Sequence, residues 1–162
     1  MIKKIKERAI ELLKQREFVS LGTADKKGIP NAAPKLLLKI NEDFVYLIDY
    51  TMARTVDNLK ENPIASLSFM DIDDLVGYRL GGSVRLIEKG KEFNRILEEL
   101  SNKLIALSAK RVIEASRTGK KNQHYELEIS KKFVVLKIKI EEIVKIGSQG
   151  DLWREEGSGI SA

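Results

Sequence analysis

The segment that most constrains the fold runs from Val76 to Leu86, where apolar and polar residues alternate. Its apolar positions would share one face of a strand: Val76, Tyr78, Leu80, Val84 and Leu86. The polar side chains would lie on the other face: Arg79, Ser83 and Arg85. This pattern is typical of a long, half-buried β-strand. Gly81 and Gly82 interrupt it, and adjacent glycines in a strand indicate a bulge or the close approach of another backbone or a ligand.

The other segments predict an antiparallel sheet with helices at its ends. Further strands are expected at residues 18–24, 31–40, 44–49, 64–70 and 133–140. Turn-forming residues at 25–30 and 41–43 join the first three strands into a meander. Amphipathic periodicity predicts helices at residues 2–16 and about 91–117, and a short helix at 53–61 is ended by Pro63.

Six such strands predict an all-β or α+β fold, a six-stranded antiparallel β-barrel with flanking helices, because closure removes exposed strand edges. The 162 residues suit one domain. We assign residues 1–146 to this domain. Residues 147–162 are rich in Gly and Ser, and we expect a C-terminal tail that is mobile or lies at a dimer interface, with Trp153 as its anchor.

The composition excludes several kinds of chemistry. There is no cysteine and His124 is the only histidine, so disulfides, thiolate metal sites, cysteine nucleophiles and multi-histidine metal sites are excluded. We therefore expect no metal. Residues 1–16 are charged and periodic, unlike a signal peptide, and no segment is apolar enough to span a bilayer. The sequence predicts a cytoplasmic protein with no membrane partner.

The charge pattern favours small anionic ligands over nucleic acid. The net charge is +5, but 29 basic residues are mixed with 24 acidic ones along the chain. A nucleic-acid-binding β-barrel is an alternative function. Such barrels usually carry aromatic side chains among basic residues on a sheet face. Aromatic residues make up only 6% of this chain, so we expect no nucleic-acid partner.

A candidate phosphate site lies in residues 44–63. This segment reads as a strand, a short connection and a helix whose first turn carries Arg54 and Thr55. Free backbone N–H groups and the helix dipole attract an anion, and a guanidinium with an adjacent hydroxyl would complete the seat. From these residues alone the alternative stays open that Arg54 is a solvated helix residue and Thr55 a cap.

Four features occur together in a characteristic order. They are the opening strand and turn at residues 19–31, the strand Leu36-Leu37-Leu38-Lys39, the pair Arg54-Thr55 followed by Asn58-Leu59 and Asn62-Pro63, and the segment Gly77-Tyr78-Arg79-Leu80-Gly81-Gly82. In this order and spacing the chain resembles the pyridoxamine 5'-phosphate oxidase-like, FMN-binding split-barrel family. The resemblance covers about residues 18–88, with a weaker echo at 133–146.

The resemblance implies a split barrel that binds FMN at a homodimer interface. The strand from Lys35 to Lys39 would run beside the flavin, with Lys39 reaching the phosphate that Arg54 and Thr55 grip. Ile48 and Asp49 would lie along the isoalloxazine ring and ribityl chain, and the strand at 78–79 would face the ring or substrate. The implied cofactor-binding residues are Lys35, Leu36, Leu37, Leu38, Lys39, Ile48, Asp49, Arg54, Thr55, Tyr78 and Arg79.

Two departures from the family pattern limit the functional expectation. Ala53 stands where many relatives have a serine, and Pro34 stands where the oxidase has an arginine. The second departure weakens pyridoxamine 5'-phosphate oxidation more than FMN binding. We expect an FMN-dependent oxidoreductase acting on an unidentified small substrate or electron donor, with no catalytic side chain assigned because the ring carries the chemistry. The alternative on the same fold is a non-catalytic module that binds flavin, deazaflavin or haem.

Overall fold

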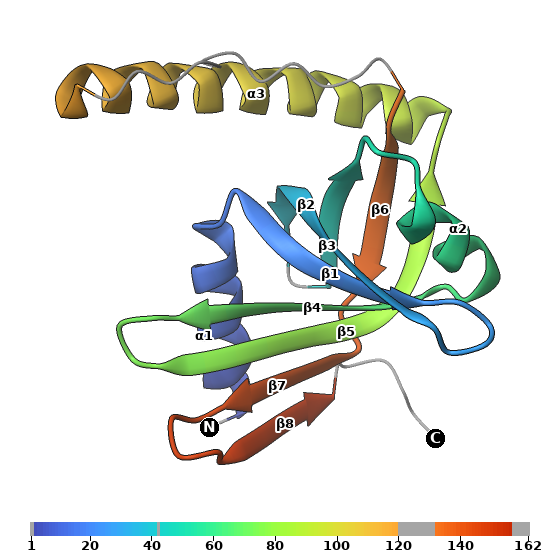
Figure 1. The fold of residues 1–162 in the computed structure, drawn as a ribbon, viewed down its shortest axis with the longest axis vertical. Coiled ribbons are helices and arrows are strands. Elements are labelled where there is room, and N and C mark those ends of the chain that lie inside the picture. Colours follow the sequence, from blue (N-terminus) through green and yellow to red (C-terminus); the bar gives the residue numbers. More distant parts are fainter. Residues whose placement is uncertain (1, 42, 120–131, 157–162) are drawn as a thin grey trace.

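Six antiparallel strands close into a barrel in the structure, a computed structural model that describes residues 2–41, 43–119 and 132–156. They are β1 (Phe18–Ala24), β2 (Pro30–Ile40), β3 (Phe44–Asp49), β4 (Ile64–Asp71), β5 (Val76–Ile87) and β6 (Val134–Lys139). They follow the order β4-β1-β2-β3-β6-β5, and pairing of β4 with β5 closes the barrel (Figure 1). The predicted six-stranded antiparallel barrel is confirmed.

A hairpin that the sequence analysis did not predict extends the sheet beyond the barrel. It consists of β7 (Glu142–Ile146), which pairs with β5, and β8 (Leu152–Glu156), which pairs with β7. Part of the segment expected to be a tail is therefore a strand. The glycines that suggested a tail form its turn, where Gly150 has φ +87° and its N–H donates to the carbonyl of Gly147. Trp153 packs against this turn and lies under Nζ of Lys145.

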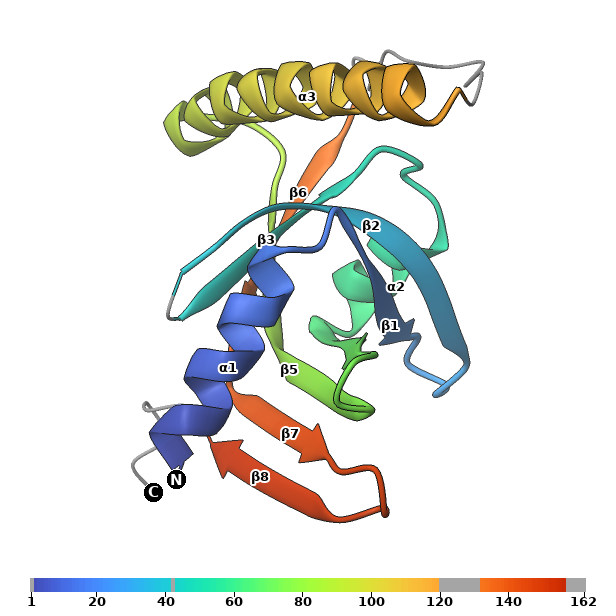
Figure 2. The ribbon, with the colours of Figure 1, turned by 90° about the vertical axis from the view of Figure 1, so that its left-hand side faces the viewer.

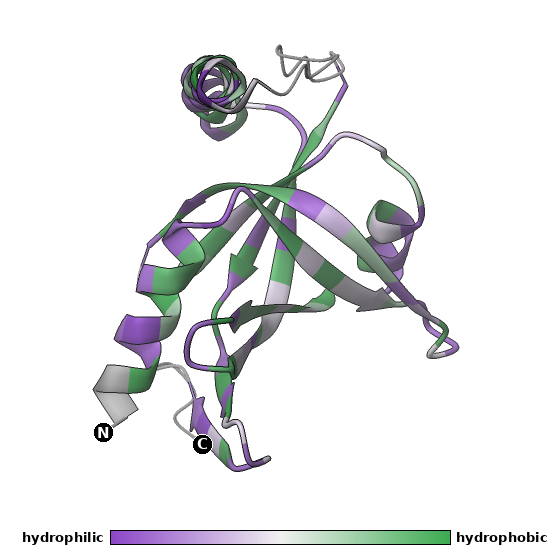
Figure 3. Cartoon of the chain, turned by 60° about the vertical axis from the view of Figure 1, so that its left-hand side comes forward, coloured by the Kyte–Doolittle hydropathy of each residue, from purple (hydrophilic) through white to green (hydrophobic). Residues whose placement is uncertain are grey.

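The barrel interior is filled by one face of each strand. The alternation predicted for β5 is confirmed, since Tyr78, Leu80 and Val84 are buried in this core whereas Arg79 and Arg85 are exposed. Two helices add apolar side chains to the same core, α1 (Ile2–Lys14) and α2 (Arg54–Glu61). Figure 3 shows hydrophobic and hydrophilic residues on different sides of α1, as its sequence period predicts.

The helices α1 and α2 close opposite ends of the barrel. Arg8 of α1 lies 3.2 Å from Asp71, the last residue of β4, whereas α2 ends at Glu61, just before β4 begins at Ile64. Helix α1 ends two residues earlier than expected, because the chain must turn before β1. Because α2 begins five residues after β3 ends at Asp49, the predicted phosphate site lies at the end of the barrel that α2 closes.

The long helix α3 (Lys91–Thr118) packs on the outside of the barrel. Figures 1 and 2 show it lying across one end of the molecule, opposite the β7–β8 hairpin. A second apolar cluster fills the space beneath it, with Ile96 and Leu100 of α3 contacting the group that contains Leu36, Leu38 and Ile48. None of the helices in the described ranges is long and apolar enough to cross a membrane.

Candidate functional site

The first turn of α2 carries donor groups that could hold an anion. Ala53 occupies the position before the helix and provides no side-chain cap. Arg54 is exposed and makes no ion pair within the described part of the chain, whereas Thr55 is buried and its Oγ1 accepts a hydrogen bond from Nδ2 of Asn31 at 3.2 Å. Because Oγ1 accepts from Asn31, the hydroxyl proton of Thr55 can still be donated. This turn can therefore offer a cation, a hydroxyl and helix N–H groups to an anion.

A polar layer holds α2 on the end of the barrel. Nδ2 of Asn58 donates to Oγ1 of Thr23 at 3.1 Å in a fully buried contact, and Nδ2 of Asn62 donates to the carbonyl of Ala24 at 3.3 Å. Together with the Asn31–Thr55 bond, these contacts tie the helix to both strands of the β1–β2 hairpin. Buried amides need such partners, so the position of Arg54 relative to the barrel is well defined.

An open groove of about 700 Å³ adjoins this layer on the outer face of the sheet. Asn31 and Asn62, which hold α2, also line it, and Arg79 lies on its far side in an ion pair with Glu142 at 2.7 Å. Its floor is made largely of small residues from four strands: Gly22, Ala24, Ala32, Ala65, Ser66, Gly81 and Gly82. A volume of this size is typical of a cofactor site.

A buried ion pair lies inside the barrel near the start of the β3–α2 connection. Nζ of Lys35 is 3.0 Å from Oδ2 of Asp49, and their side chains are 2% and 0% exposed. Burial alone would raise the pKa of Asp49, but the Lys35 ammonium and hydrogen bonds from Thr51 outweigh it, so this pKa is lowered. The two charged groups contact each other, and the Asp49 carboxylate also contacts the connection. Neither residue lines the groove.

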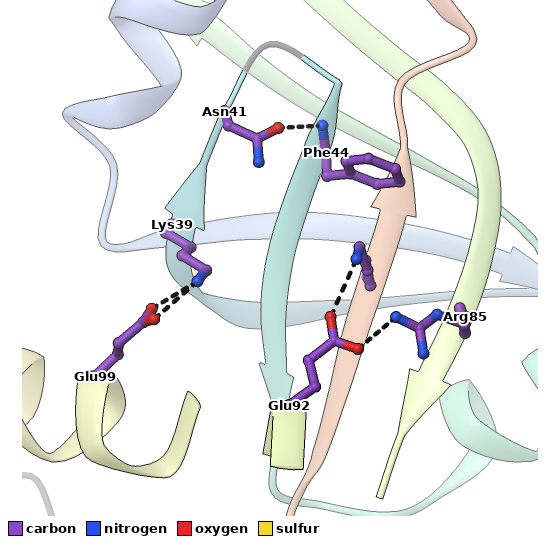
Figure 4. A network of polar contacts seen from close by, with 7 residues as sticks. Lys39, Asn41, Phe44, Arg85, Glu92 and Glu99 are labelled. Atoms are coloured by element: carbon purple, nitrogen blue, oxygen red, sulfur yellow. Dashed lines mark hydrogen bonds and ion pairs between the residues drawn. The ribbon is translucent and has the colours of Figure 1, made fainter. Parts of the chain in front are cut away.

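Lys39 lies at the other end of the same strand pair. It pairs with Tyr46 of β3. Tyr46 is three residues from Asp49, where β3 ends, a distance of about 10 Å along a strand. Its Nζ is 2.7 Å from a carboxylate oxygen of Glu99 on α3 and lies over the Tyr46 ring at 4.7 Å. Figure 4 shows this contact. The structure therefore does not bring Lys39 to the Arg54–Thr55 turn.

The start of α3 is held on the barrel by a second carboxylate. Glu92 accepts from Arg85 and Lys137, at 2.5 and 3.0 Å, and the Arg85 contact is drawn in Figure 4. Hydrogen bonds from these two cations lower the pKa of Glu92, those from Arg85 most. Nζ of Lys103 donates to the carbonyl of Leu38 at 3.0 Å farther along the helix. Polar contacts thus fix α3 over the β2–β3–β6 surface.

The remaining predicted site residues fall into two groups. Leu36, Leu38 and Ile48 lie beneath α3 in the outer apolar cluster. Leu37 and Tyr78 point into the barrel core, where burial raises the pKa of the tyrosine, so only their backbone atoms could meet a ligand outside. Among the predicted residues, Arg79 lines the groove, and Thr55 is hydrogen-bonded to Asn31, which also lines it. Arg54 precedes Thr55 at the start of α2. Their role as cofactor contacts remains a prediction.

Sequence analysis did not assign Asn31, Asn58 or Asn62 to the site. Each was part of a noted motif, and each connects α2 to the barrel or lines the groove. Their positions in the sequence could have indicated them. Asn31 directly follows the Gly28-Ile29-Pro30 turn, and Asn58 and Asn62 come four and eight residues after Arg54. Pairing of these amides with specific strand atoms could be seen only once the strands were in register. His124 lies outside the described residues.

Comparisons with known proteins agree with this architecture. An uncharacterized protein of Methanocaldococcus jannaschii is 30% identical over 104 residues, which is 62% of this chain and 68% of that protein. A Clostridium acetobutylicum protein related to general stress protein 26, of the pyridoxinephosphate oxidase family, has a similar structure. Its TM-score is 0.63 at 17% identity, and the match covers 96% of each chain.

Two further structures share the fold but differ in the ligand that their names give. A Nostoc punctiforme protein described as pyridoxamine 5'-phosphate oxidase-related and FMN-binding has a TM-score of 0.52 at 14% identity, covering 97% of this chain and 95% of its own. A haem-binding protein of Mycobacterium smegmatis has a TM-score of 0.63 at 18% identity, covering 94% of this chain and 57% of its own. At these identities the likeness shows the fold alone.

The sequence profile described as pyridoxamine 5'-phosphate oxidase matches residues 5–147, which include all six barrel strands, the groove and the first turn of α2. This chain therefore belongs to the pyridoxamine 5'-phosphate oxidase family.

Proposed function

We propose that the chain binds FMN and acts as an FMN-dependent oxidoreductase. The observation that carries this proposal is Arg54, an exposed guanidinium without an ion-pair partner in the described chain. It starts a helix whose next residue, Thr55, is hydrogen-bonded to Asn31 of a groove of about 700 Å³. The family match and the FMN-binding relative support the choice of nucleotide. The donor set suits a phosphate dianion, because one helix turn supplies a cation, a hydroxyl and N–H groups.

FMN, when bound, would supply the redox chemistry through its isoalloxazine ring. Arg54 and Thr55 would hold the phosphate. The uncharged, small-residue floor of the groove would let a flat ring approach the sheet, and Arg79, paired with Glu142, would line its far side. The substrate would be a small molecule or electron donor that reaches the ring from solvent.

We further propose a homodimer with the flavin at its interface. The groove is open, and apolar side chains stand on the same outer sheet face, with Ile64 51% and Met70 47% exposed. A second copy placed against this face would bury these side chains and complete the walls of the site. Light scattering of the flavin-loaded protein would give a mass near 37 kDa for the dimer, twice 18.3 kDa.

A haem-binding module is the second candidate, favoured by the similarity to the mycobacterial haem-binding protein. Haem iron is usually held by His, Cys, Met or Tyr. This chain has no cysteine and one histidine, His124, so its other candidate axial ligands are its three methionines and four tyrosines.

Absorbance of the purified protein separates the two candidates. Bound FMN would give flavin bands that heat denaturation releases as free FMN, and apo-protein would regain them on addition of FMN. An intense Soret band with no flavin uptake would support haem binding instead. A colourless preparation that takes up neither molecule would refute both proposals.

A further inference from the structure

We propose that Asp49 and Lys35 form a buried positioning pair that fixes the β3–α2 connection and thereby the phosphate-binding turn. This inference rests on the proposed function. It assigns the two residues a different role from direct flavin contact. Their charged groups face the barrel interior, and the connection they control leads straight to Arg54.

The two oxygens of the Asp49 carboxylate have separate tasks. Oδ1 accepts three hydrogen bonds, from the backbone N–H of Thr51 at 2.9 Å, its hydroxyl at 2.8 Å and the N–H of Met52 at 3.2 Å. Oδ2 forms an ion pair with Nζ of Lys35 at 3.0 Å and accepts no hydrogen bond among the described residues. Lys35 thus balances the buried charge of the carboxylate, and Oδ1 of the carboxylate shapes the connection.

The connection contains a backbone conformation that needs this support. Met52 has φ +49°, in the left-handed region that residues other than glycine rarely adopt, at a cost of about 1–2 kcal/mol. Its side chain is 45% exposed, so packing contributes little to holding it. The bond from its N–H to Asp49 is the contact that favours this conformation. Since Arg54 follows two residues later, a change at Met52 would displace the guanidinium.

Stability alone does not require a charged pair at this place. Replacing a buried ion pair by apolar residues is often neutral or stabilising. Such a replacement would, however, leave the N–H groups of Thr51 and Met52 without their acceptor. The effect of the pair on the connection can therefore be tested apart from its effect on overall stability. Its loss should disorder the connection while the barrel remains folded.

The test uses the paired substitution Lys35→Met/Asp49→Leu in the full chain. Two quantities are measured: hydrogen-exchange protection of the Thr51 and Met52 amides by NMR, and the ratio of FMN to riboflavin affinity. Riboflavin lacks the phosphate, so the ratio reports the phosphate seat. We expect both protections to be lost and FMN affinity to fall about tenfold or more with riboflavin affinity unchanged, as for loss of a charge-assisted contact.

Arg8→Met is the matched control, because it removes the cation paired with another buried carboxylate, Asp71, at the opposite end of the barrel. It should lower the melting temperature yet leave the protections and the affinity ratio unchanged. Lys35→Met/Asp49→Asn retains Oδ1 as an acceptor and should keep the Met52 amide protected. This second variant decides the matter if the leucine variant does not fold.

A folded leucine variant with wild-type protection of both amides and a wild-type affinity ratio would overturn the inference. Loss of Met52 protection in a folded asparagine variant would also contradict the role assigned to Oδ1. If the wild-type protein binds no FMN, the proposed function fails, whereas hydrogen exchange still decides whether the pair orders the connection.

Discussion

Gly82 of β5 faces the carbonyl oxygen of Lys139 so closely that a Cβ at Gly82 would lie 1.8 Å from it. At this point the chain leaves β6, which pairs with residues 84–87 of β5, and crosses to β7, which pairs with residues 77–81. The N–H of Glu141 donates to the carbonyl of Gly81 at 3.0 Å in the same crossing. The barrel and its hairpin extension thus meet over a residue that can only be glycine.

Gly82→Ala should destabilise the protein by several kcal/mol, about 3 or more, because two backbone segments must separate. Gly81→Ala is the matched control: its Cβ would be 3.6 Å from the carbonyl of Ala65, an ordinary contact. Urea unfolding of both variants checks this. Equal midpoints for the two variants would contradict the close approach described here.

The sequence could predict strand β5 but not which backbone segment passes over Gly82. Period-two alternation identified the buried face of β5, and the glycine pair indicated a close approach. Which backbone approaches depends on the β6–β7 crossing, which brings together residues more than fifty positions apart. Strand β8 was missed for a related reason, since its Gly-rich turn and polar residues resemble a tail until β7 provides a pairing edge.

Lys35→Met should be strongly destabilising, by about 3–5 kcal/mol, because it leaves the buried Asp49 carboxylate without its cation. Adding Asp49→Leu should restore most of this loss, since the pair is then replaced by apolar side chains. Chemical denaturation of the wild type, the single variant and the double variant gives the comparison. A double variant no more stable than Lys35→Met would disagree with this account of the pair.

The same pair predicts a dependence of stability on acid pH. The pKa of Asp49 is lowered in the folded protein, so its carboxylate contributes stability above the unfolded-state value of about 3.9, and this is lost as the pH falls further. The free energy of unfolding should therefore fall less steeply below pH 4 in Lys35→Met/Asp49→Leu than in the wild type. Glu92, whose pKa is also lowered, titrates in both proteins and cancels in the comparison. If the free energy of unfolding fell equally steeply below pH 4 in both proteins, the role of Asp49 in acid stability would be contradicted.

Leu100→Ala should cost about 2–4 kcal/mol, because Leu100 is 2% exposed and holds α3 in the outer apolar cluster. Ile105→Ala on the same helix should change stability by less than about 0.5 kcal/mol, since Ile105 is 69% exposed. Thermal unfolding distinguishes the two. Comparable losses would mean that α3 packs differently from its position in Figure 2.

The candidate site was only partly predictable. Arg54 and Thr55 were predicted as phosphate contacts because a helix start attracts anions and because the chain resembles an FMN-binding family, and this role stays a prediction. Lys39 was placed near them by resemblance, yet strand geometry puts it opposite Tyr46 and in contact with Glu99 of α3. The ion pair of Lys35 with Asp49 could not be predicted from the sequence either. A lysine among leucines looks like a surface residue until the strand register places Asp49 beside it.

The most direct test of the account is the FMN affinity of the apo-protein, measured by quenching of flavin fluorescence, before and after Arg54→Ala. We expect binding to weaken by on the order of 1–3 kcal/mol, the worth of a charge-assisted hydrogen bond, while the fold is retained. Lys60→Ala, an exposed cation in the last turn of the same helix, should leave the affinity unchanged. Equal FMN affinity of wild type and Arg54→Ala, or no FMN binding by the wild type, would contradict the account.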